Sequence, residues 1–380
     1  MKVMIVVTHL LGTGHLSRAL ILGRAFAEQN HDVLVISGGM PAPQLDTSGL
    51  TLLSLPPLRS DGADFTRLLD QNGAIADAAY FDARTTGLTQ AIRSFEPQIL
   101  ITELYPFGRR SLAAEFRAAL KAARELPQPS IILNSIRDIL APPSKPAKAN
   151  QADEIIAEYY DGVLVHSDPQ ITPLSVSWPV TPQLASRLHY TGFVAPTAPP
   201  HHPDGIGQGE IVVSAGGGSV GQPIFQAAIE AARKMPNKRW RLLVGGQDAK
   251  ARIAKLSQLA EGASIILEPV RPDFRQMLPL VEASVSMCGY NTAMDVLQSG
   301  TPAVLIPFDD GQEVEQGLRA RALSHLDGIE VLNSSNLSGP TLANALGRAL
   351  SSAVRPPMTE GFNGAHRSVE IATELFEARP

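Results

Sequence analysis

Short apolar runs alternate along the chain with longer stretches in which apolar residues recur every three or four positions. The first run spans residues 2–9, a recurring pattern follows at residues 15–29, and a second run spans residues 32–37. Continuous apolar runs are typical of strands buried on both faces, and the recurring pattern is typical of helices that cover them. The start of the chain therefore predicts a strand, a helix and a second strand in a mainly parallel sheet.

The alternation continues in two series, separated by a stretch rich in Pro and Gly at residues 190–209. The first series predicts further strands at residues 51–55, 98–104, 130–134 and 162–166, with helices at 75–95 and 111–124. The second series predicts strands at residues 210–214, 239–244, 264–267, 283–287 and 303–307, with helices that begin near residues 221, 248, 273, 292 and 315. Two such series predict two doubly wound α/β domains of Rossmann-like type.

The domain boundaries follow from the same pattern. We expect a first domain at residues 1–193, a linker at 194–209, a second domain at 210–355 and a C-terminal segment at 356–380. A chain of 380 residues with 44% hydrophobic content is long enough for two cores. The C-terminal segment has a helical pattern that we expect to pack back on the first domain.

Composition narrows the classes of function. The formal net charge of −5 argues against a protein that binds nucleic-acid phosphates, because such proteins carry a basic excess. A single cysteine, Cys288, excludes an internal disulfide and a cysteine-rich metal site. No apolar run approaches the roughly 18 residues that a membrane helix needs. We expect a cytoplasmic protein, and peripheral contact with the inner face of the membrane stays open.

Two glycine-rich turns follow apolar strands. One consists of Gly216, Gly217, Gly218 and Ser219, between the predicted strand at 210–214 and the next helix. Glycine lets the backbone approach an anion, and free amides at a helix start favour a diphosphate. A tight turn from strand to helix that binds no ligand would need the same residues.

The other turn is GTGH, which contains Gly12 and Gly14 and ends at His15. A helix start lowers the pKa of an imidazole, so a neutral His15 could accept a proton from an acceptor hydroxyl. The two glycines are the backbone positions that we expect beside the acceptor. A histidine that caps the helix or faces solvent is an equally good interpretation at this stage.

Residues 288–308 form the densest pattern in the chain. Thr292 and Asp295 have the spacing of a capping box, which is a sufficient structural reason for both. That reason does not explain Gly289 and Asn291, which come just before the helix at the carboxyl end of a strand, where donors face a ligand. We also expect Asp295 on the first helical turn, where its carboxylate can accept both hydroxyls of a ribose.

Charged residues also follow a strand in the first domain. Glu103 ends a predicted strand, and Arg109 and Arg110 come within one loop of it. A carboxylate there could act as a base or orient an acceptor, and the arginines could hold an anionic acceptor. A surface loop with solvated charges is the alternative, and it is the better one for Arg110.

The other histidines carry weaker signals. His166 and Asp168 lie at a strand end without a partner in the sequence, so we interpret them as loop or wall residues. His201 and His202 lie in the linker without other metal ligands at useful spacing, and we expect both to be exposed to solvent.

The pattern of Gly289, Asp295, Gly300 and Pro302, followed by VLIPF and EVEQGLRARAL, resembles the nucleotide-sugar half of MurG-type glycosyltransferases. The stretches GTGHLSRA and ITELYPFGRR are similar to predicted glycosyltransferases related to them. The resemblance spans nearly the whole chain. It implies the GT-B fold, in which two Rossmann-like doubly wound domains face a cleft, and inverting transfer from a UDP-sugar without a metal.

Position by position, the resemblance implies a donor site in the second domain. Asp295 stands where the family has a ribose-binding Glu, and Val270 stands where the family's backbone meets the uracil. His15 matches the histidine that ends the family's N-terminal glycine loop, near the acceptor. The resemblance also implies a diphosphate turn at Gly217, Gly218 and Ser219 and contacts with the donor sugar from Gln312, Glu315 and Gln316. The predicted donor site further includes Gly216, Gly289, Asn291 and Thr292. The chain lacks one glycine of the MurG loop and has Val194 to Pro196 where MurG has an Arg, so the acceptor is not identified.

The resemblance thus implies an inverting glycosyltransferase that moves a hexosyl or N-acetylhexosaminyl group from a UDP-sugar, a co-substrate, to an acceptor hydroxyl. His15 or Glu103 is the predicted base, and Gly12, Gly14 and Arg109 are predicted to bind a small-molecule, glycan or lipid-linked acceptor. Neither a metal nor another cofactor is expected. One alternative is a UDP-sugar 2-epimerase or UDP-sugar hydrolase on the same fold. Another is a non-catalytic partner subunit that binds a sugar nucleotide.

Overall fold

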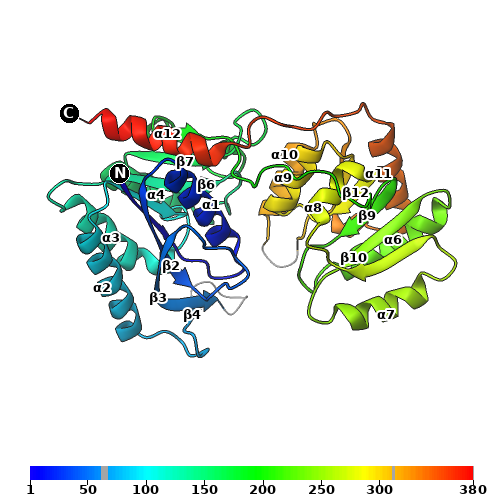
Figure 1. Ribbon diagram of the computed structural model, residues 1–380, viewed down its shortest axis with the longest axis horizontal. Coiled ribbons are helices and arrows are strands. Elements are labelled where there is room, and N and C mark those ends of the chain that lie inside the picture. Colours follow the sequence, from blue (N-terminus) through cyan, green and yellow to red (C-terminus); the bar gives the residue numbers. More distant parts are fainter. Residues whose placement is uncertain (61–66, 310–312, 380) are drawn as a thin grey trace. The chain divides into compact units, whose positions relative to one another are not determined.

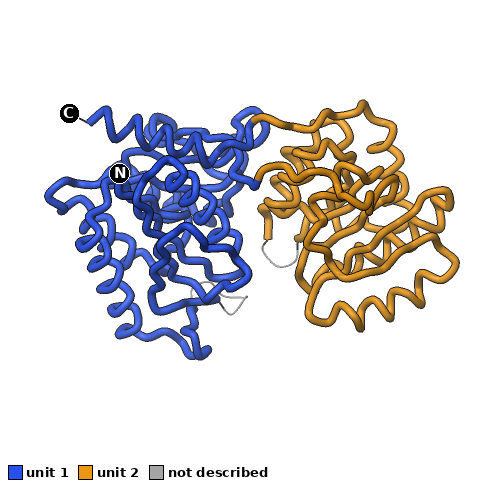
Figure 2. Tube along the Cα trace, in the orientation of Figure 1, with its two compact units in different colours: residues 1–196, 361–380 blue, residues 197–360 orange. Residues whose placement is uncertain are grey.

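The structure is a computed structural model that describes residues 1–60, 67–309 and 313–379. It divides into two compact units, Met1–Pro196 with Gly361–Pro380 (unit 1) and Thr197–Glu360 (unit 2), as Figure 2 shows. The segment expected as a separate linker, residues 194–209, is divided between them. Val194 pairs with Asn363 inside unit 1, and the amide of Gly209 donates to the carbonyl of Leu280 inside unit 2.

Unit 1 is built on a mainly parallel sheet. Its strands are β1 (Lys2–Val7), β2 (Asp32–Gly39), β3 (Thr51–Ser60), β4 (Leu68–Leu69), β5 (Ile99–Glu103), β6 (Ile131–Arg137), β7 (Gly162–His166) and β8 (Leu188–Tyr190). They lie in the order β4-β3-β2-β1-β5-β6-β7-β8, and only the short pairing of β3 with β4 is antiparallel. Its helices are α1 (Gly14–Glu28), α2 (Ala78–Phe95), α3 (Ala113–Arg124), α4 (Pro146–Tyr159), α5 (Pro182–Ala185) and α12 (Gly364–Glu377), with 3-10 turns at Arg110–Leu112 and Leu174–Val176.

The residues of β1 alternate between two cores. Met4 and Val6 pack with side chains of α2, α3 and α4 on one face of the sheet. Val3 and Ile5 pack on the other face with α1 and α12. Because helices cover both faces, the central strand is apolar at nearly every position, which explains its continuous apolar run.

Unit 2 contains a second sheet of parallel strands. They are β9 (Glu210–Ser214), β10 (Arg239–Val244), β11 (Ile265–Pro269), β12 (Ala283–Ser286), β13 (Ala303–Leu305) and β14 (Ile329–Val331), in the order β11-β10-β9-β12-β13-β14. This is the order 3-2-1-4-5-6 of doubly wound nucleotide-binding folds. The helices are α6 (Gln222–Lys234), α7 (Ala249–Leu259), α8 (Phe274–Met277), α9 (Tyr290–Ser299), α10 (Glu315–Leu323) and α11 (Gly339–Ser351), with 3-10 turns at Leu278–Leu280 and Ser334–Asn336.

The central strand of unit 2 is also covered on both sides. Ile211 and Val213 of β9 pack in a core with α6, α7 and α11, while Val212 faces Met277 and Leu278. The prediction of two Rossmann-like α/β domains is therefore confirmed.

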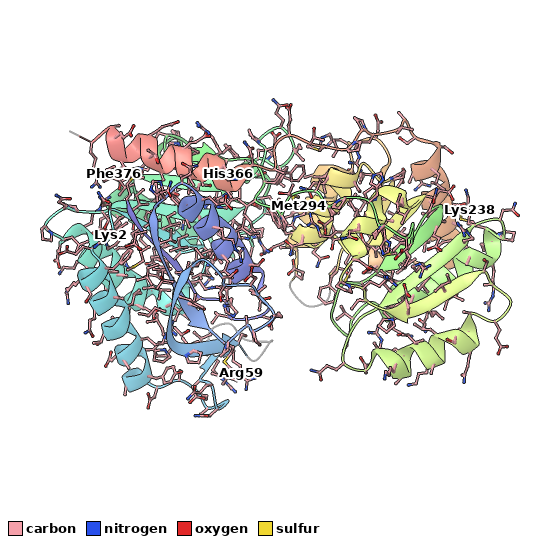
Figure 3. All side chains as sticks on the ribbon, viewed as in Figure 1. Lys2, Arg59, Lys238, Met294, His366 and Phe376 are labelled. Carbon is pink, nitrogen blue, oxygen red and sulfur yellow. The ribbon has the colours of Figure 1, made fainter. Side chains whose placement is uncertain are left out.

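The last helix returns to unit 1. In Figure 1, α12 is the red helix that lies beside α1, and Figure 3 labels His366 and Phe376 towards its two ends. Val369 and Ala372 of α12 are fully buried against the core that α1 covers. Within the described part of the chain, no helix combines the length and the apolar character needed to cross a membrane.

Candidate functional site

The structure brings together the two predicted catalytic residues of unit 1. His15 is the second residue of α1, and Glu103 is the last residue of β5. Because β1 and β5 are parallel neighbours, the chain after β1 and the end of β5 meet at the same sheet edge. The Nδ1 atom of His15 lies 2.9 Å from both carboxylate oxygens of Glu103.

Arg18, which was not among the predicted site residues, completes this group. It lies one helical turn after His15, and its buried guanidinium donates through Nη2 to Oε1 of Glu103. The same nitrogen is 3.3 Å from Nδ1 of His15. The i, i+3 spacing of His15 and Arg18 places both on one face of a helix, and this signal could have identified Arg18.

The shorter of the two contacts of Nδ1, the one with Glu103, favours one tautomer of His15. A bare Nδ1 lone pair facing a carboxylate would place two acceptors against each other, so Nδ1 carries the hydrogen and donates it to Glu103. Nε2 is then the ring nitrogen that can accept a proton. In serine hydrolases the same arrangement of a histidine and a buried carboxylate orients a general base.

Burial dominates the electrostatics of the pair. Burial lowers the pKa of His15 to about 4, and the neighbouring Glu103 opposes this change only in part. Burial acts to raise the pKa of Glu103, but His15, Arg18 and Arg109 outweigh it and the pKa lies well below its ordinary value. At neutral pH the site therefore contains a neutral imidazole, with 16% of its side chain exposed, beside an ionised carboxylate.

The loop after β5 is held in an uncommon conformation. Leu104 and Arg109 are non-glycine residues with φ of 70° and 58°, a backbone region that costs free energy for side-chain-bearing residues. Asn134 and Tyr160 both donate to the carbonyl of Tyr105 inside this loop. These buried contacts hold the loop, so the position of Glu103 at its start is well defined.

The two arginines of this loop have different surroundings. The Nε of Arg109 donates to the carbonyl of Thr8 at 2.7 Å, and burial lowers the pKa of its guanidinium. Its charge lies close enough to influence both His15 and Glu103. Arg110 instead donates to the carbonyl of Phe107 at 3.0 Å and lies 6.0 Å from the ring of Trp178. Arg109 is therefore the arginine associated with the candidate site.

His166 forms part of the wall behind this group. Its ring nitrogens lie 2.9 Å from the hydroxyls of Ser135 and Thr191, and the side chain is fully buried. Burial lowers its pKa to about 3. Asp168 accepts from the amide of Gln170 in a turn. Both residues have local structural partners.

The glycine turn of unit 2 leaves open space around its backbone. Gly216 has φ of 80°, and a Cβ atom added at Gly216 or Gly217 would have no neighbour within 4 Å. Helix α6 begins at Gln222, with Gly221 as its N-cap, in agreement with the expected start near residue 221. The turn at Gly216 to Ser219 therefore precedes the helix rather than forming its first residues.

A second glycine pair, Gly245 and Gly246, which was not among the predicted site residues, supports this turn. The amide of Gly246 donates to the carbonyl of Gly217 at 3.1 Å, and a Cβ on Gly245 would lie 2.3 Å from the carbonyl oxygen of Gly216. Ser219 donates to Asp248 at 3.0 Å just beyond this pair. The sequence GGQD directly after an apolar strand carried the missing signal.

Helix α9 begins earlier than we expected, and the predicted capping box is wrong. Its N-cap is Gly289 and its first residue is Tyr290, so Thr292 lies inside the helix and caps nothing. Asp295 consequently lies on the second turn, where Nε of Arg275 donates to its Oδ1 at 2.6 Å. Asn291 is exposed near the helix start.

The remaining donor residues lie at loops of unit 2. Val270 follows β11 with 39% exposure, and its amide donates to the carbonyl of Val244, so only its carbonyl is left for a ligand. Glu315 is the first residue of α10, and the side-chain oxygen of Gln316 accepts from the amide of Phe308 at 3.1 Å. Gln312 lies outside the described residues.

The expectation that His202 faces solvent is wrong. Its side chain is buried, and its Nε2 lies 3.0 Å from Oδ2 of Asp273 in the loop after β11. Its Nδ1 accepts from the amide of Asp204 at 3.1 Å, so Nε2 carries the hydrogen that Asp273 accepts. His202 thereby ties the start of unit 2 to the loop that contains Val270, whereas His201 is exposed.

Residues 212–374 match the glycosyltransferase family 28 C-terminal domain. This part of the chain is therefore similar to domains of that family. A UDP-N-acetylglucosamine–N-acetylmuramyl-(pentapeptide) pyrophosphoryl-undecaprenol N-acetylglucosamine transferase from Brucella anthropi is 31% identical over 157 residues, which are 40% of this chain and 41% of that protein. The chain thus matches less than half the length of this curated relative.

Solved structures with low sequence identity share the whole fold. MurG from Acinetobacter baumannii superimposes with a TM-score of 0.64 at 14% identity, covering 99% of both chains. A structure described as a UDP-N-acetylglucosamine 2-epimerase from Listeria monocytogenes gives a TM-score of 0.59 at 13% identity, covering 100% of this chain and 97% of the other. At such identities the likeness concerns the fold, which is the GT-B fold of glycosyltransferases.

Proposed function

We propose that this protein is an inverting glycosyltransferase that transfers a hexosyl or N-acetylhexosaminyl group from a UDP-sugar to an acceptor hydroxyl without a metal. The observation that carries the proposal is the contact of His15 with the buried carboxylate of Glu103, on a chain whose residues 212–374 match the family 28 C-terminal domain. A neutral histidine with one nitrogen fixed by a carboxylate is suited to remove a hydroxyl proton.

The donor binds to unit 2 in this proposal. Backbone amides of the turn at Gly216 to Ser219 hold the diphosphate, and the open space around Gly217 leaves room for its oxygens. The carbonyl of Val270 meets the base, and Asp295 accepts from the ribose. Gly289, Asn291 and Thr292 lie at the start of α9, whose amides face the same ligand.

The proton transfer uses the groups of unit 1. Nε2 of His15 takes the proton of the acceptor hydroxyl while its oxygen forms the bond to the anomeric carbon, and the bond from that carbon to the diphosphate breaks. UDP leaves with the bonding electrons. The imidazolium that forms is stabilised by the carboxylate of Glu103 through Nδ1. Attack opposite the leaving diphosphate inverts the anomeric centre.

The acceptor binds near the GTGH turn. No neighbour lies within 4 Å of a Cβ added at Gly12 or Gly14, and Arg109 brings a positive charge to the same group of residues. These features suit an acceptor with an anionic group, including one linked to a lipid. A lipid-linked acceptor would place the protein at the inner face of the membrane as a peripheral enzyme.

Isothermal titration calorimetry with UDP, dTDP and GDP, each with and without a sugar, tests the donor half. We expect UDP and a UDP-sugar to bind, and His15→Ala to leave their affinity unchanged while it abolishes turnover. If no nucleoside diphosphate binds the full chain, the proposal is wrong.

A 2-epimerase remains the second candidate, because one of the structures with the same fold carries that description. NMR analysis of a UDP-sugar incubated without acceptor separates the two activities. An unchanged sugar supports the transferase, a C2-inverted sugar supports the epimerase, and free sugar indicates a hydrolase. UDP affinity without turnover in either the wild type or His15→Ala would indicate a non-catalytic subunit.

A further inference from the structure

A small pocket of about 180 Å³ lies within unit 2, beside the predicted ribose ligand. Its polar lining includes Asp295, Gln298 and Arg275, and its apolar walls include Pro199 and Pro357. Asp295 and Gln298 are three residues apart on α9, so they lie on one face of that helix. Arg275 comes from the short helix α8.

The guanidinium of Arg275 holds three groups at once. Its Nε donates to Oδ1 of Asp295 at 2.6 Å, and its Nη2 donates to the side-chain oxygen of Gln298 at 3.0 Å and to the carbonyl of Thr197 at 3.1 Å. The guanidinium is planar, so these contacts fix its orientation as well as its position. They also tie α9 to the first residue of unit 2.

The same contacts leave one oxygen of Asp295 for a ligand. Oδ1 accepts from Arg275, whereas Oδ2 has no hydrogen-bond partner among the residues that the structure describes. Only 12% of the Asp295 side chain is exposed. Burial raises the pKa of Asp295, and the contact with Arg275 opposes that change. Arg275 thus favours a charged Asp295 with a single free acceptor.

We propose that Arg275 is a positioning residue for ribose recognition, and that through Asp295 it makes the donor site prefer ribonucleoside diphosphates to their 2′-deoxy counterparts. The inference rests on the proposed function, since it assigns Asp295 to the donor ribose. An ionised acceptor with a fixed orientation gains a charge-assisted hydrogen bond from a ribose hydroxyl, and the 2′-deoxy sugar offers one hydroxyl fewer.

A purely structural Arg275 makes a different prediction. A partly buried ion pair between two helices can simply hold α8 against α9. Its loss would then weaken UDP and 2′-deoxy-UDP equally, because nothing would link it to the 2′-hydroxyl. The ratio of the two affinities therefore distinguishes positioning from general support.

The experiment measures Kd for UDP and 2′-deoxy-UDP by calorimetry on the full chain. We expect the wild type to prefer UDP by about 10- to 100-fold, the range for a hydrogen bond to a charged group. In Arg275→Ala and in Asp295→Asn the preference should fall to below about 3-fold. Arg348→Ala, which removes an exposed ion pair with Glu330, is the matched control and should keep the wild-type ratio.

Arg275→Lys keeps the test decisive if Arg275→Ala does not fold. It retains the positive charge but cannot hold three groups in one plane. It should reduce the preference for UDP while the melting temperature stays close to that of the wild type. The inference is overturned if the wild type binds both nucleotides equally, or if folded Arg275→Ala or Arg275→Lys keeps the full preference. If the wild type binds neither nucleotide, the proposed function itself fails.

Discussion

The two candidate sites of this chain consist of different kinds of group, side chains in unit 1 and mainly glycine backbone in unit 2. In unit 1, His15, Arg18 and Glu103 are side chains already bonded to one another in a mostly buried group. In unit 2, the predicted diphosphate turn consists of glycine backbone with open space around it. The ribose position, Asp295 with Arg275, instead resembles the paired charges of unit 1.

The difference has a physical reason. A group that must transfer a proton needs a fixed tautomer and a shifted pKa, and both require buried partners. A group that binds a diphosphate needs amides and room, which glycine supplies without any side chain. Substitutions in unit 1 should therefore affect chemistry and stability together, whereas a substitution at Gly217 of the glycine turn should affect ligand binding alone.

The largest effect should come from Glu103→Gln. The change removes the charge that holds Nδ1–H of His15 and that neutralises buried Arg18, so we expect kcat to fall by about 10²- to 10⁴-fold and the melting temperature to fall as well. The imidazole nitrogen shifts in ¹⁵N NMR should show a mixture of tautomers instead of one. Glu125→Gln, at the exposed C-cap of α3, is the control and should change neither quantity. Wild-type kcat in Glu103→Gln would contradict the role of the pair.

The second effect concerns pH and should be confined to unit 1. His15 and His166 have pKa values of about 4 and about 3 in the folded state, against roughly 6.5 when unfolded. The unfolded state therefore binds more protons, so the stabilisation is complete above about pH 6.5 and is lost as the pH falls from there towards 3. A pKa difference of one corresponds to about 1.4 kcal/mol, so protonation of the two histidines should lower the free energy of unfolding by several kcal/mol.

Each unit contains one buried tryptophan, so the unfolding of the two units can be followed separately by tryptophan fluorescence. Trp178 reports on unit 1 and Trp240 on unit 2, and Trp→Phe variants isolate each signal. Urea unfolding at pH 7, 6 and 5 should show the Trp178 midpoint falling with pH. In His166→Gln that slope should be smaller. A Trp178 midpoint independent of pH would show that these histidines are not buried in the neutral form.

The third effect separates binding from stability in unit 2. Gly217→Ala adds a methyl group where the structure has open space, so the melting temperature should stay unchanged while UDP binds about tenfold or more weakly. Gly347→Ala on α11 also has open space and is the matched control, with unchanged UDP affinity. Gly245→Ala should instead lower the melting temperature, because its Cβ would meet the carbonyl of Gly216. Full UDP affinity in Gly217→Ala would remove this turn from the donor site.

The smallest effect should come from His202→Ala. His202 holds Asp273, but Arg271 also donates to both oxygens of Asp273, so the loop that contains Val270 should loosen only in part. We expect UDP affinity to fall about 2- to 10-fold, the equivalent of one hydrogen bond. His325→Ala, an exposed histidine of the same unit, should have no effect. If His202→Ala weakened UDP binding more than Gly217→Ala does, the contact with the base would contribute more to UDP affinity than the contact with the diphosphate.

The apolar pattern predicted the fold well where strands and helices were strongly apolar. The expected strand at residues 210–214 coincides with β9, and α1 begins within one residue of its predicted start. The pattern missed α4, whose 14 residues include many small and polar side chains, and the three-residue strand β14, which is too short to show a period. Elements without a strong apolar face depend on tertiary packing and leave little signal in the sequence.

The candidate site shows the same division residue by residue. The type and position of His15 and Glu103 were predictable, since each follows a strand in a pattern typical of sites at sheet edges. Their mutual contact was not, because it joins residues 88 positions apart. The predicted capping box at Thr292 failed because helix α9 begins at Tyr290. The prediction that His202 is exposed was wrong because the composition of the linker does not reveal its contact with Asp273.

Local backbone preference and apolar periodicity suffice to predict the alternation of strands and helices, the two glycine turns and the chemical types available at each sheet edge. They do not predict which charges meet, which histidines are neutral or which carboxylate oxygen is free. Those properties depend on burial and on neighbours brought together by adjacent strands, as β1 and β5 bring His15 to Glu103.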